Sequence, residues 1–292
     1  IVPSSSTVGL SSFGVMIIKE YRVLMPLALD EYRKGQLFAV AEASKNETGG
    51  GEGVEVMKQE EFTSSMIKPG ETISGIYTLK LYRIKSKSPW ILRKLLPDGA
   101  FILREDCWNA YPYCKTILTN PEYMGNNFYI IIESMHIEDD GTTPNDTTPE
   151  TDPRIFHSKI TGRGPLTEDW AQTTEPVMCC YKVVQVLFKW RGLQARIERL
   201  AHKQYPRLFT KFHRETFCWI DRWYDLTMDE IKELEGRTVQ QLKQQMIDPQ
   251  KRGICADDDD LPSRQHSRRL SLATAIARFD RRSKQQGKDS NK

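Results

Sequence analysis

Two different hydrogen-bond donors lie two residues apart in the segment TISGIYTLKLYRIK, residues 72–85. Its alternation predicts a long strand in which Ile76, Thr78, Lys80, Tyr82 and Ile84 share one face. The Thr78 hydroxyl and the Lys80 ammonium would then project together and could donate hydrogen bonds to one ligand. Because lysines are rarely buried, a solvent-facing Lys80 is the simpler interpretation of this segment alone.

A second lysine, Lys182, interrupts the apolar face of another alternating segment, residues 178–189. The predicted strand otherwise carries on that face Met178, Cys180, Val184, Val186 and Phe188. A buried lysine with an anionic partner is one interpretation, and a lysine on an edge strand is the other. Cys179 and Cys180 are strand neighbours that face opposite ways, so they are not expected to chelate a metal together.

The sequence argues against several kinds of catalysis. The run GGGEG (residues 49–53) lacks the pattern GxxxxGK[ST] and leads into the strand-like VEVMK, which predicts a turn rather than a nucleotide site. Cys114 forms no recognisable Cys/His signature with any of the five histidines, so we expect a lining residue and not a nucleophile. No CxxC pair is present. We therefore expect no enzyme, no bound metal and no cofactor.

Strand signals come first along the chain and long helices last. Further strands are expected at residues 17–25, 54–58, 112–119 and 128–137. Asp30 is the expected N-cap of a helix that ends near Ser44, and a longer helical period begins at Leu193 and contains Pro206. Thr227 and Glu230 predict a capping box that starts a last helix, ending near residue 246. This order indicates an α+β fold with a mainly antiparallel sheet packed on long helices.

The composition is ordinary for a globular protein: 292 residues, 39% hydrophobic, 28% charged, with a formal net charge of +3. No run of 18 apolar residues occurs, so any membrane contact should be peripheral. We interpret residues 1–15 as a non-core extension and residues 256–292, rich in Lys and Arg, as a disordered basic tail with no nucleic acid partner. The cysteine pattern and the absence of a signal segment indicate the cytoplasm.

Several motifs resemble class I phosphatidylinositol transfer proteins. The matching segments are residues 19–56, WNAYPYC (108–114), HSKITGRGPL (157–166), KWRGLQ (189–194), LFTKFHRETFCWID (208–221) and DLTMDEI (225–231). The resemblance covers most of a domain at residues 16–255, shortened around residues 138–156. It implies a START-like helix-grip fold, in which a curved, mainly antiparallel sheet and long helices enclose a phospholipid cavity. It also implies a monomeric carrier that exchanges phosphatidylinositol or phosphatidylcholine between membranes and supports phosphoinositide supply.

The resemblance also implies roles for individual residues. Those that match the family's inositol contacts are Thr78, Lys80, Asn109 and Glu235. Those that match its phosphate contacts are Gln36, Thr116, Ser134 and Lys182. Cys114 corresponds to a residue that lines the cavity. Hydroxyl, ammonium and amide donors with a carboxylate acceptor suit a ring of inositol hydroxyls.

Membrane docking is expected at the segment SPWILRKLLPDG (residues 88–99), the counterpart of a mobile lid. The predicted docking residues are Trp90, Ile91, Leu92, Leu95, Leu96 and Trp190. A satellite piece of the core is the other interpretation of this segment. We expect transient contact with Golgi, endoplasmic reticulum or other membranes.

Two possible phosphorylation sites are Ser158, by the resemblance, and Ser271, which follows Arg268, Arg269 and Leu270 in a pattern that resembles a basophilic kinase site. Two alternatives to lipid transfer stay open. One is a lipid-binding sensor or adaptor that does not move its lipid, and the other is a lipid hydrolase, for which no nucleophile and base can be assigned.

Overall fold

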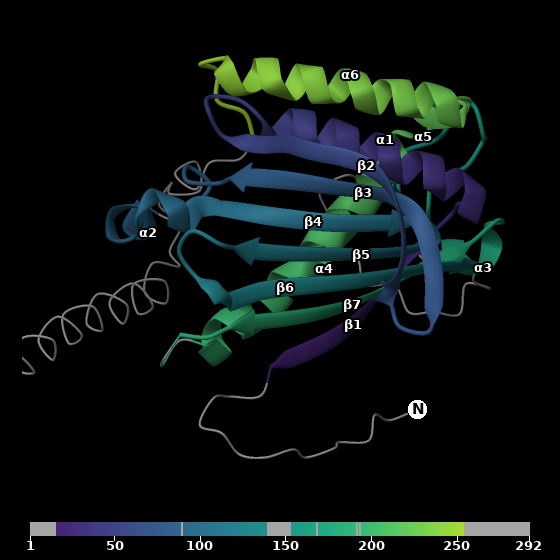
Figure 1. Cartoon of the computed structure of the whole chain (residues 1–292). Coiled ribbons are helices and arrows are strands. Elements are labelled where there is room, and N and C mark those ends of the chain that lie inside the picture. The colour runs from purple at the N-terminus through teal and green to yellow at the C-terminus, as the bar shows by residue number, and fades with distance from the viewer. Residues whose placement is uncertain are drawn as a thin grey trace, which may run out of the picture.

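A single antiparallel sheet of seven strands, in the order β1-β7-β6-β5-β4-β3-β2, forms the centre of the protein (Figure 1). The computed structural model describes residues 16–88, 90–138, 153–167, 169–190, 192 and 194–253. The strands are β1 (Ile17–Met25), β2 (Gly53–Lys68), β3 (Glu71–Arg83), β4 (Ile102–Ala110), β5 (Tyr113–Asn120), β6 (Gly125–Glu138) and β7 (Met178–Phe188). Two register shifts in the pairing of β2 with β3 accompany the bend of β2, as expected of β-bulges.

The long helices cover one face and one edge of this sheet. The helices are α1 (Leu29–Glu47), α2 (Trp90–Leu95), the 3-10 turn η1 (Asp98–Phe101), α3 (Trp170–Thr173), α4 (Gln194–Cys218), α5 (Ile220–Trp223) and α6 (Met228–Ile247). Helix α4 crosses behind the sheet and packs on β1 and β7, whereas α1 and α6 lie side by side and pack on β2 (Figure 1). The α+β fold with a curved antiparallel sheet is therefore confirmed. No described helix is both long and apolar enough to cross a membrane.

Several details of the secondary structure differ from the predictions, and β2 runs to Lys68, well beyond the strand predicted at residues 54–58. The first helix begins after Ala28 rather than with Asp30 as its cap, and the Ala28 amide donates to the Glu31 side chain at 2.9 Å. Strand β4 was not predicted, because its sequence ILREDCWNA alternates charged and polar residues on both faces and lacks an apolar stripe.

Pro206 lies inside α4, where its missing N–H leaves the carbonyl of His202 without its helical partner. That carbonyl accepts a hydrogen bond from the Tyr21 hydroxyl at 3.0 Å, and the same hydroxyl lies 2.9 Å from Nδ1 of His202. Tyr21 belongs to β1, so the proline site also joins the helix to the sheet. The interior proline is thus accommodated within one continuous helix.

The capping box of the last helix is confirmed. The amide of Glu230 donates to Oγ1 of Thr227 at 3.2 Å, and the amide of Thr227 donates to Glu230 at 2.8 Å. We expect Thr227→Ala to lower the free energy of unfolding by about 1 kcal/mol, because an orphan amide loses its acceptor. Urea unfolding measures this, with Thr227→Ser as the matched control that keeps the hydroxyl. Equal stability of the alanine and serine variants would contradict the assignment.

The hydrophobic core lies toward one side of the molecule. It is built from β1, β7, α1, α4, α5 and the start of α6, with Leu27, Tyr32, Met178 and Trp223 fully buried. None of its described members belongs to β3, β4 or β5. The helix-covered face of the middle strands is therefore not filled by this core, and its side chains remain partly accessible.

Candidate functional site

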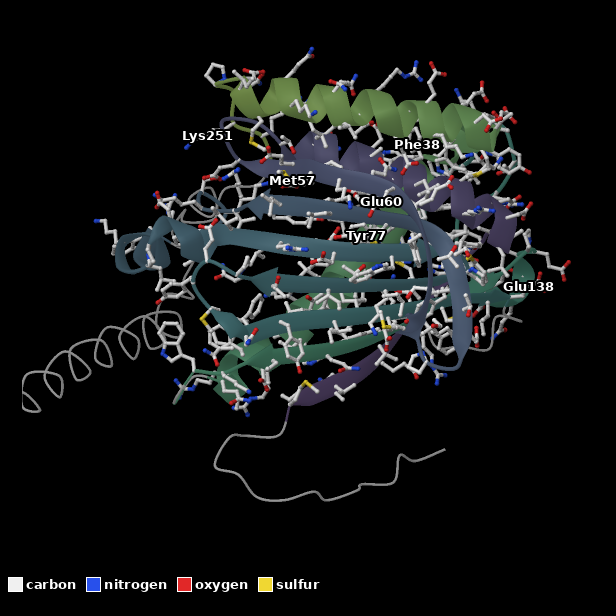
Figure 2. The ribbon with its side chains drawn as sticks, viewed as in Figure 1. Phe38, Met57, Glu60, Tyr77, Glu138 and Lys251 are labelled. Atoms are coloured by element: carbon white, nitrogen blue, oxygen red, sulfur yellow. The ribbon has the colours of Figure 1, made fainter. Side chains whose placement is uncertain are left out.

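The helix-covered face of the sheet, called the inner face below, gathers most of the predicted ligand residues. Residues that pair directly across antiparallel strands point to the same side. The register thus brings together seven of the predicted residues, namely Thr78, Lys80, Asn109, Cys114, Thr116, Ser134 and Lys182. Tyr77, labelled in Figure 2, alternates with Thr78 and belongs to the opposite, outer face. The prediction that Thr78 and Lys80 share a face is confirmed.

The two remaining predicted residues come from helices. Gln36 lies one turn after Tyr32 on α1, so the two share a helix face. The ring of Tyr32 lies 4.9 Å from the ring of His136 on β6, which turns this helix face toward the inner face of the sheet. Glu235 lies on α6, where burial raises its pKa and the charge of Lys80 opposes that rise. Glu235 is therefore close enough to Lys80 to interact with it electrostatically.

Lys80 is not a solvent-facing lysine. Its Nζ lies 3.3 Å from Oε1 of Glu105 on β4, and each of the two side chains is only 13% exposed. The hydroxyl of Tyr82 donates to the other oxygen of Glu105 at 2.9 Å. Burial alone would lower the pKa of Lys80, but the facing Glu105 carboxylate outweighs it and raises that pKa above its usual value. Lys80 therefore stays charged inside the protein.

Lys182 marks a second polar region of the inner face. Its strand β7 pairs with β1 on one side and β6 on the other, so the interpretation as an edge-strand lysine was wrong. Nζ of Lys182 donates to Oγ of Ser134 at 3.2 Å and lies 5.2 Å from the ring centre of Phe209 on α4. In the described part of the chain no carboxylate forms an ion pair with it. A partly buried ammonium without a carboxylate is suited to an anionic ligand.

Asn109 lies where β3 and β4 approach each other closely, and its side-chain oxygen is buried. A Cβ added at Gly75 would lie 2.0 Å from the carbonyl oxygen of Asn109, so only glycine permits β3 to approach β4 here. The buried Oδ1 of Asn109 has no hydrogen-bond partner among the described residues. An unpartnered buried acceptor is unfavourable unless a ligand or water supplies the donor.

On β5, β6 and β7 the inner face changes from polar to apolar along the strands, whereas β3 and β4 keep Lys80 and Glu105 at the level of Leu118. Beyond Thr116 and Ser134, toward the end of the sheet where α2 lies, its residues on β5, β6 and β7 are Leu118, Ile130, Ile132, Val184 and Val186. Aromatic rings continue this apolar end: Trp190 stacks on Phe188 at 6.0 Å and lies 6.1 Å from Tyr123. The inner face therefore has a polar region suited to a charged group and an apolar region, on β5 to β7 toward α2, suited to hydrocarbon.

The segment predicted to be a lid contains a short helix, α2, at the apolar end of the sheet (Figure 1). Trp90 is 49% exposed, and the Lys94 ammonium lies 5.2 Å from its ring centre. Leu96 is partly buried, as is Trp190 within its aromatic cluster. The side chains of Ile91, Leu92 and Leu95 lie outside the described set.

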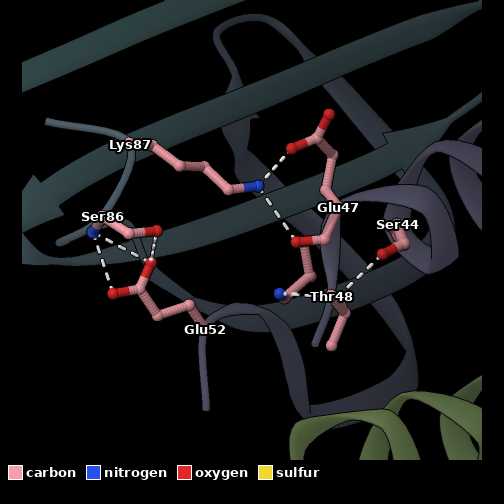
Figure 3. Close-up of polar contacts among 7 residues, drawn as sticks. Ser44, Glu47, Thr48, Glu52, Ser86 and Lys87 are labelled. Carbon is pink, nitrogen blue, oxygen red and sulfur yellow. Dashed lines mark hydrogen bonds and ion pairs between the residues drawn. The ribbon is translucent and has the colours of Figure 1, made fainter. Parts of the chain in front are cut away.

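The glycine-rich run is a turn, and Figure 3 shows how Glu52 within it and the nearby Glu47 contact Ser86 and Lys87, which precede α2. Gly50, Gly51 and Gly53 adopt positive φ, and the run leads into β2 rather than a helix. The Glu52 carboxylate accepts from the amide of Ser86 at 2.8 and 2.9 Å, and Lys87 forms an ion pair with Glu47. Glu52 of this turn and Glu47 at the end of α1 thus hold the segment before α2, a role that their sequence context did not predict.

The remaining predictions concern modification and catalysis. Ser158 is fully buried, and its hydroxyl donates to Asp221, so a kinase could not reach it without opening of this loop. Ser271 and the tail, residues 1–15 and most of the shortened region lie outside the described residues. Cys114 is buried, and among the described residues no histidine is bonded to its thiol. The lining role predicted for Cys114 is consistent with this position.

Two inner-face residues were missed at the level of sequence. Glu105 lies on the unpredicted strand β4, and only the pairing of β4 with β3 reveals that it faces Lys80. His136 is buried between the rings of Tyr32 and Tyr111, and neither of its ring nitrogens has a hydrogen-bond partner among the described residues. The available signal was its position two residues after Ser134 on the same strand, which places both side chains on one face.

Comparisons with known proteins bear on this arrangement. A family model described as phosphatidylinositol transfer protein matches residues 16–148 and 142–240. The chain is 43% identical over 277 residues to the phosphatidylinositol transfer protein beta isoform of Homo sapiens, covering 84% of this chain and 100% of the relative. Phosphatidylinositol transfer protein 1 of Dictyostelium discoideum is 39% identical over 260 residues, covering 79% of this chain and 96% of that protein.

A longer relative matches as well. Membrane-associated phosphatidylinositol transfer protein 1 of Homo sapiens is 39% identical over 263 residues, which cover 79% of this chain and 21% of that protein.

Proposed function

Because this chain belongs to the phosphatidylinositol transfer protein family, we propose that it carries one phospholipid at a time between membranes, with phosphatidylinositol and phosphatidylcholine as its alternative cargoes. The observation that carries this proposal is the polar-to-apolar change along the inner face. A phospholipid shows the same change from polar to apolar along its length, because a charged headgroup is joined to two hydrocarbon chains. The carrier itself performs no chemistry on its cargo.

The headgroup is assigned to the polar region of the inner face. Thr78, Lys80, Asn109 and Glu235 contact the inositol ring, whose hydroxyls both donate and accept hydrogen bonds. This is supported by the unpartnered Oδ1 of Asn109 and by the interaction of Lys80 with Glu235. Glu105 holds the Lys80 ammonium in position by their 3.3 Å contact.

The phosphate is assigned to Gln36, Thr116, Ser134 and Lys182. The Lys182 ammonium supplies the charge, and its bond to Ser134 fixes its direction toward the inner face. Phosphatidylcholine shares the phosphate but not the inositol hydroxyls, so it uses this second set alone. Cys114 lines the cavity between the two sets, across from Asn109 on the neighbouring strand.

The acyl chains occupy the apolar end under β5, β6 and β7, and they leave past α2. Exposing two such chains to water would cost about 25 cal/mol per Å², so release requires contact with a membrane. The exposed Trp90 and the apolar residues around it provide that contact. We place the working protein in the cytoplasm, as a monomer that transiently meets Golgi, endoplasmic reticulum or other membranes.

Mass spectrometry of lipid retained by the purified full chain tests the cargo. We expect one phospholipid per chain, divided between phosphatidylinositol and phosphatidylcholine. Protein without phospholipid would contradict the proposal. Recovery of lysophospholipid or free fatty acid that disappears in a Cys114→Ser variant would instead indicate a hydrolase.

Docking through α2 gives a separate prediction. Replacing Trp90 and Leu95 together by alanine should slow transfer between vesicles by at least about tenfold while the unfolding midpoint stays unchanged. Burial of even one apolar side chain in lipid contributes about 1.5 to 3 kcal/mol, and about 1.4 kcal/mol corresponds to a factor of ten. Met66→Ala is the matched control, since Met66 is 87% exposed but lies near the end of β2, at the end of the sheet opposite α2 (Figure 1). Unchanged transfer in the double variant, or an equal loss in the control, would show that docking occurs elsewhere.

A further inference from the structure

Two thiols meet on the inner face, between the residues assigned to the inositol and to the phosphate. Cys107 lies on β4 and Cys114 on β5, and their sulfur atoms are 3.8 Å apart. Cys107 pairs with Thr78 on one neighbouring strand and with Thr116 on the other. The Thr116 hydroxyl lies 3.5 Å from the sulfur of Cys107, as a donor to it. The position of Cys107 therefore joins both parts of the proposed headgroup site.

The two thiols are electrostatically unequal. The hydrogen bond from the Cys114 thiol lowers the pKa of Cys107, and the Lys80 ammonium acts in the same direction against the effects of burial and of Glu105. The same bond raises the pKa of Cys114. A thiolate beside a thiol is the arrangement that thiol oxidation to a disulfide requires, because the thiolate is the nucleophile.

We propose that Cys107 and Cys114 form a reversible disulfide that weakens retention of phosphatidylinositol. This inference rests on the proposed function for its effect on lipid, but formation of the bond does not depend on it. The sulfur atoms must approach from 3.8 Å to about 2.05 Å. Closing that gap draws Cys107 away from Thr116 and pulls together the strand segments that carry Asn109 and Thr116.

The oxidant is a small hydroperoxide. The Cys107 thiolate attacks its terminal oxygen, the O–O bond breaks, and the departing alkoxide takes a proton to leave as an alcohol, or as water when the oxidant is hydrogen peroxide. The sulfur of Cys114 then attacks the sulfenic acid of Cys107, the S–O bond breaks, and water leaves with the thiol proton. Two thiols thus lose two electrons, which reduce one peroxide bond. A dithiol reductant reverses the reaction.

Other described cysteines are poorly placed to compete. Cys179 and Cys180 are strand neighbours that point to opposite faces, and Cys218 lies on α4. All five described cysteines are in the thiol state. Cys107 is only partly buried, and its sulfur lies within 4 Å of the sulfur of Cys114.

The test exposes the full chain to hydrogen peroxide, alkylates the remaining thiols, and maps peptides without reduction. We expect a Cys107 to Cys114 crosslink that dithiothreitol reverses and that is absent from Cys107→Ser. Cys218→Ser is the matched control and should crosslink like the unaltered chain. No crosslink, or one that joins a different pair, would overturn the proposal.

The lipid readout uses the same samples. Oxidation should lower retention of phosphatidylinositol by about threefold to tenfold relative to phosphatidylcholine, as expected when one headgroup hydrogen bond is weakened. In Cys107→Ser the ratio of the two lipids should be the same before and after peroxide. An unchanged ratio in crosslinked protein would overturn the regulatory role. If the protein with reduced thiols retains no lipid, the proposed function is refuted instead. The peptide map still decides the thiol chemistry in that case.

Discussion

Replacing Lys80 by methionine is expected to reduce retention of phosphatidylinositol by about tenfold to a hundredfold while phosphatidylcholine is retained. The ammonium lies in the inositol set and is held charged by Glu105. A hydrogen bond from a charged group contributes about 1.5 to 3 kcal/mol, which corresponds to this range of affinity. Choline offers no hydroxyls to this set, so its lipid should not respond. Mass spectrometry of the lipid that each variant retains gives the ratio.

The same substitution removes one partner of a buried ion pair, so its effect on folding must be separated from its effect on lipid. Lys80→Met alone should lose roughly 3 kcal/mol of stability, because Glu105 is left without its counter-charge. The double variant Lys80→Met, Glu105→Gln should recover most of that stability but not the inositol lipid. Recovery of both would show that Lys80 acts only on the fold.

A lysine on the outer face supplies the matched control. Lys115 lies 3.0 Å from Glu133 and forms a comparable, partly exposed ion pair on the other side of the sheet. Lys115→Met should leave the ratio of the two lipids unchanged. An equal loss of phosphatidylinositol in this variant would contradict the assignment of the headgroup to the inner face.

Acidification from pH 7 to pH 5 is expected to destabilise the protein through two buried histidines. Burial, together with the charge of Lys182, lowers the pKa of His136 to about 2. Burial and Lys182 also lower the pKa of His213 to about 3. In the unfolded chain both should titrate near 6.5. The stability they contribute is therefore complete above about pH 6.5 and is lost as the pH falls, because the unfolded state binds protons that the folded state excludes.

The size of this effect follows from the linkage relation. Well below pH 6.5 each histidine should contribute a slope of about 1.4 kcal/mol per pH unit. Urea unfolding at several pH values measures the slope. His136→Phe should lower this slope by the contribution of one histidine. The variant should otherwise fold normally, since neither nitrogen of His136 has a described hydrogen-bond partner to lose. The neutral state of His213 should persist, because its Nε2 lies 3.0 Å from the Tyr32 hydroxyl and its Nδ1 faces the Phe209 carbonyl. An unchanged slope in His136→Phe would contradict the low pKa.

Segments with strong local signals could be predicted from the sequence. The alternation of residues 17–25 gives β1 with its observed ends, and the Thr227 capping box gives the start of α6. Strand β4 could not be predicted in this way, because its inner face carries Glu105, Cys107 and Asn109 rather than apolar residues. The polarity that hides the strand from pattern analysis is the property that suits it to a ligand.

The candidate site shows the same limit. Spacing alone places Thr78 beside Lys80, but it cannot say whether that face is wet or buried. Burial of Lys80 depends on Glu105, a partner 25 positions along the chain whose approach is fixed only by strand pairing. Lys182 likewise could be assigned to an interior strand only after β1 was seen to pair with β7. Pairings between distant segments carry this information, and local propensity does not.

Transfer of labelled phosphatidylinositol and phosphatidylcholine between two vesicle populations tests the central claim most directly. The full chain should move both lipids at rates proportional to its concentration, and Lys80→Met should move phosphatidylcholine as before but phosphatidylinositol about tenfold to a hundredfold more slowly. A protein that retains a phospholipid through purification but moves neither lipid between vesicles would contradict the carrier function and would indicate a lipid sensor.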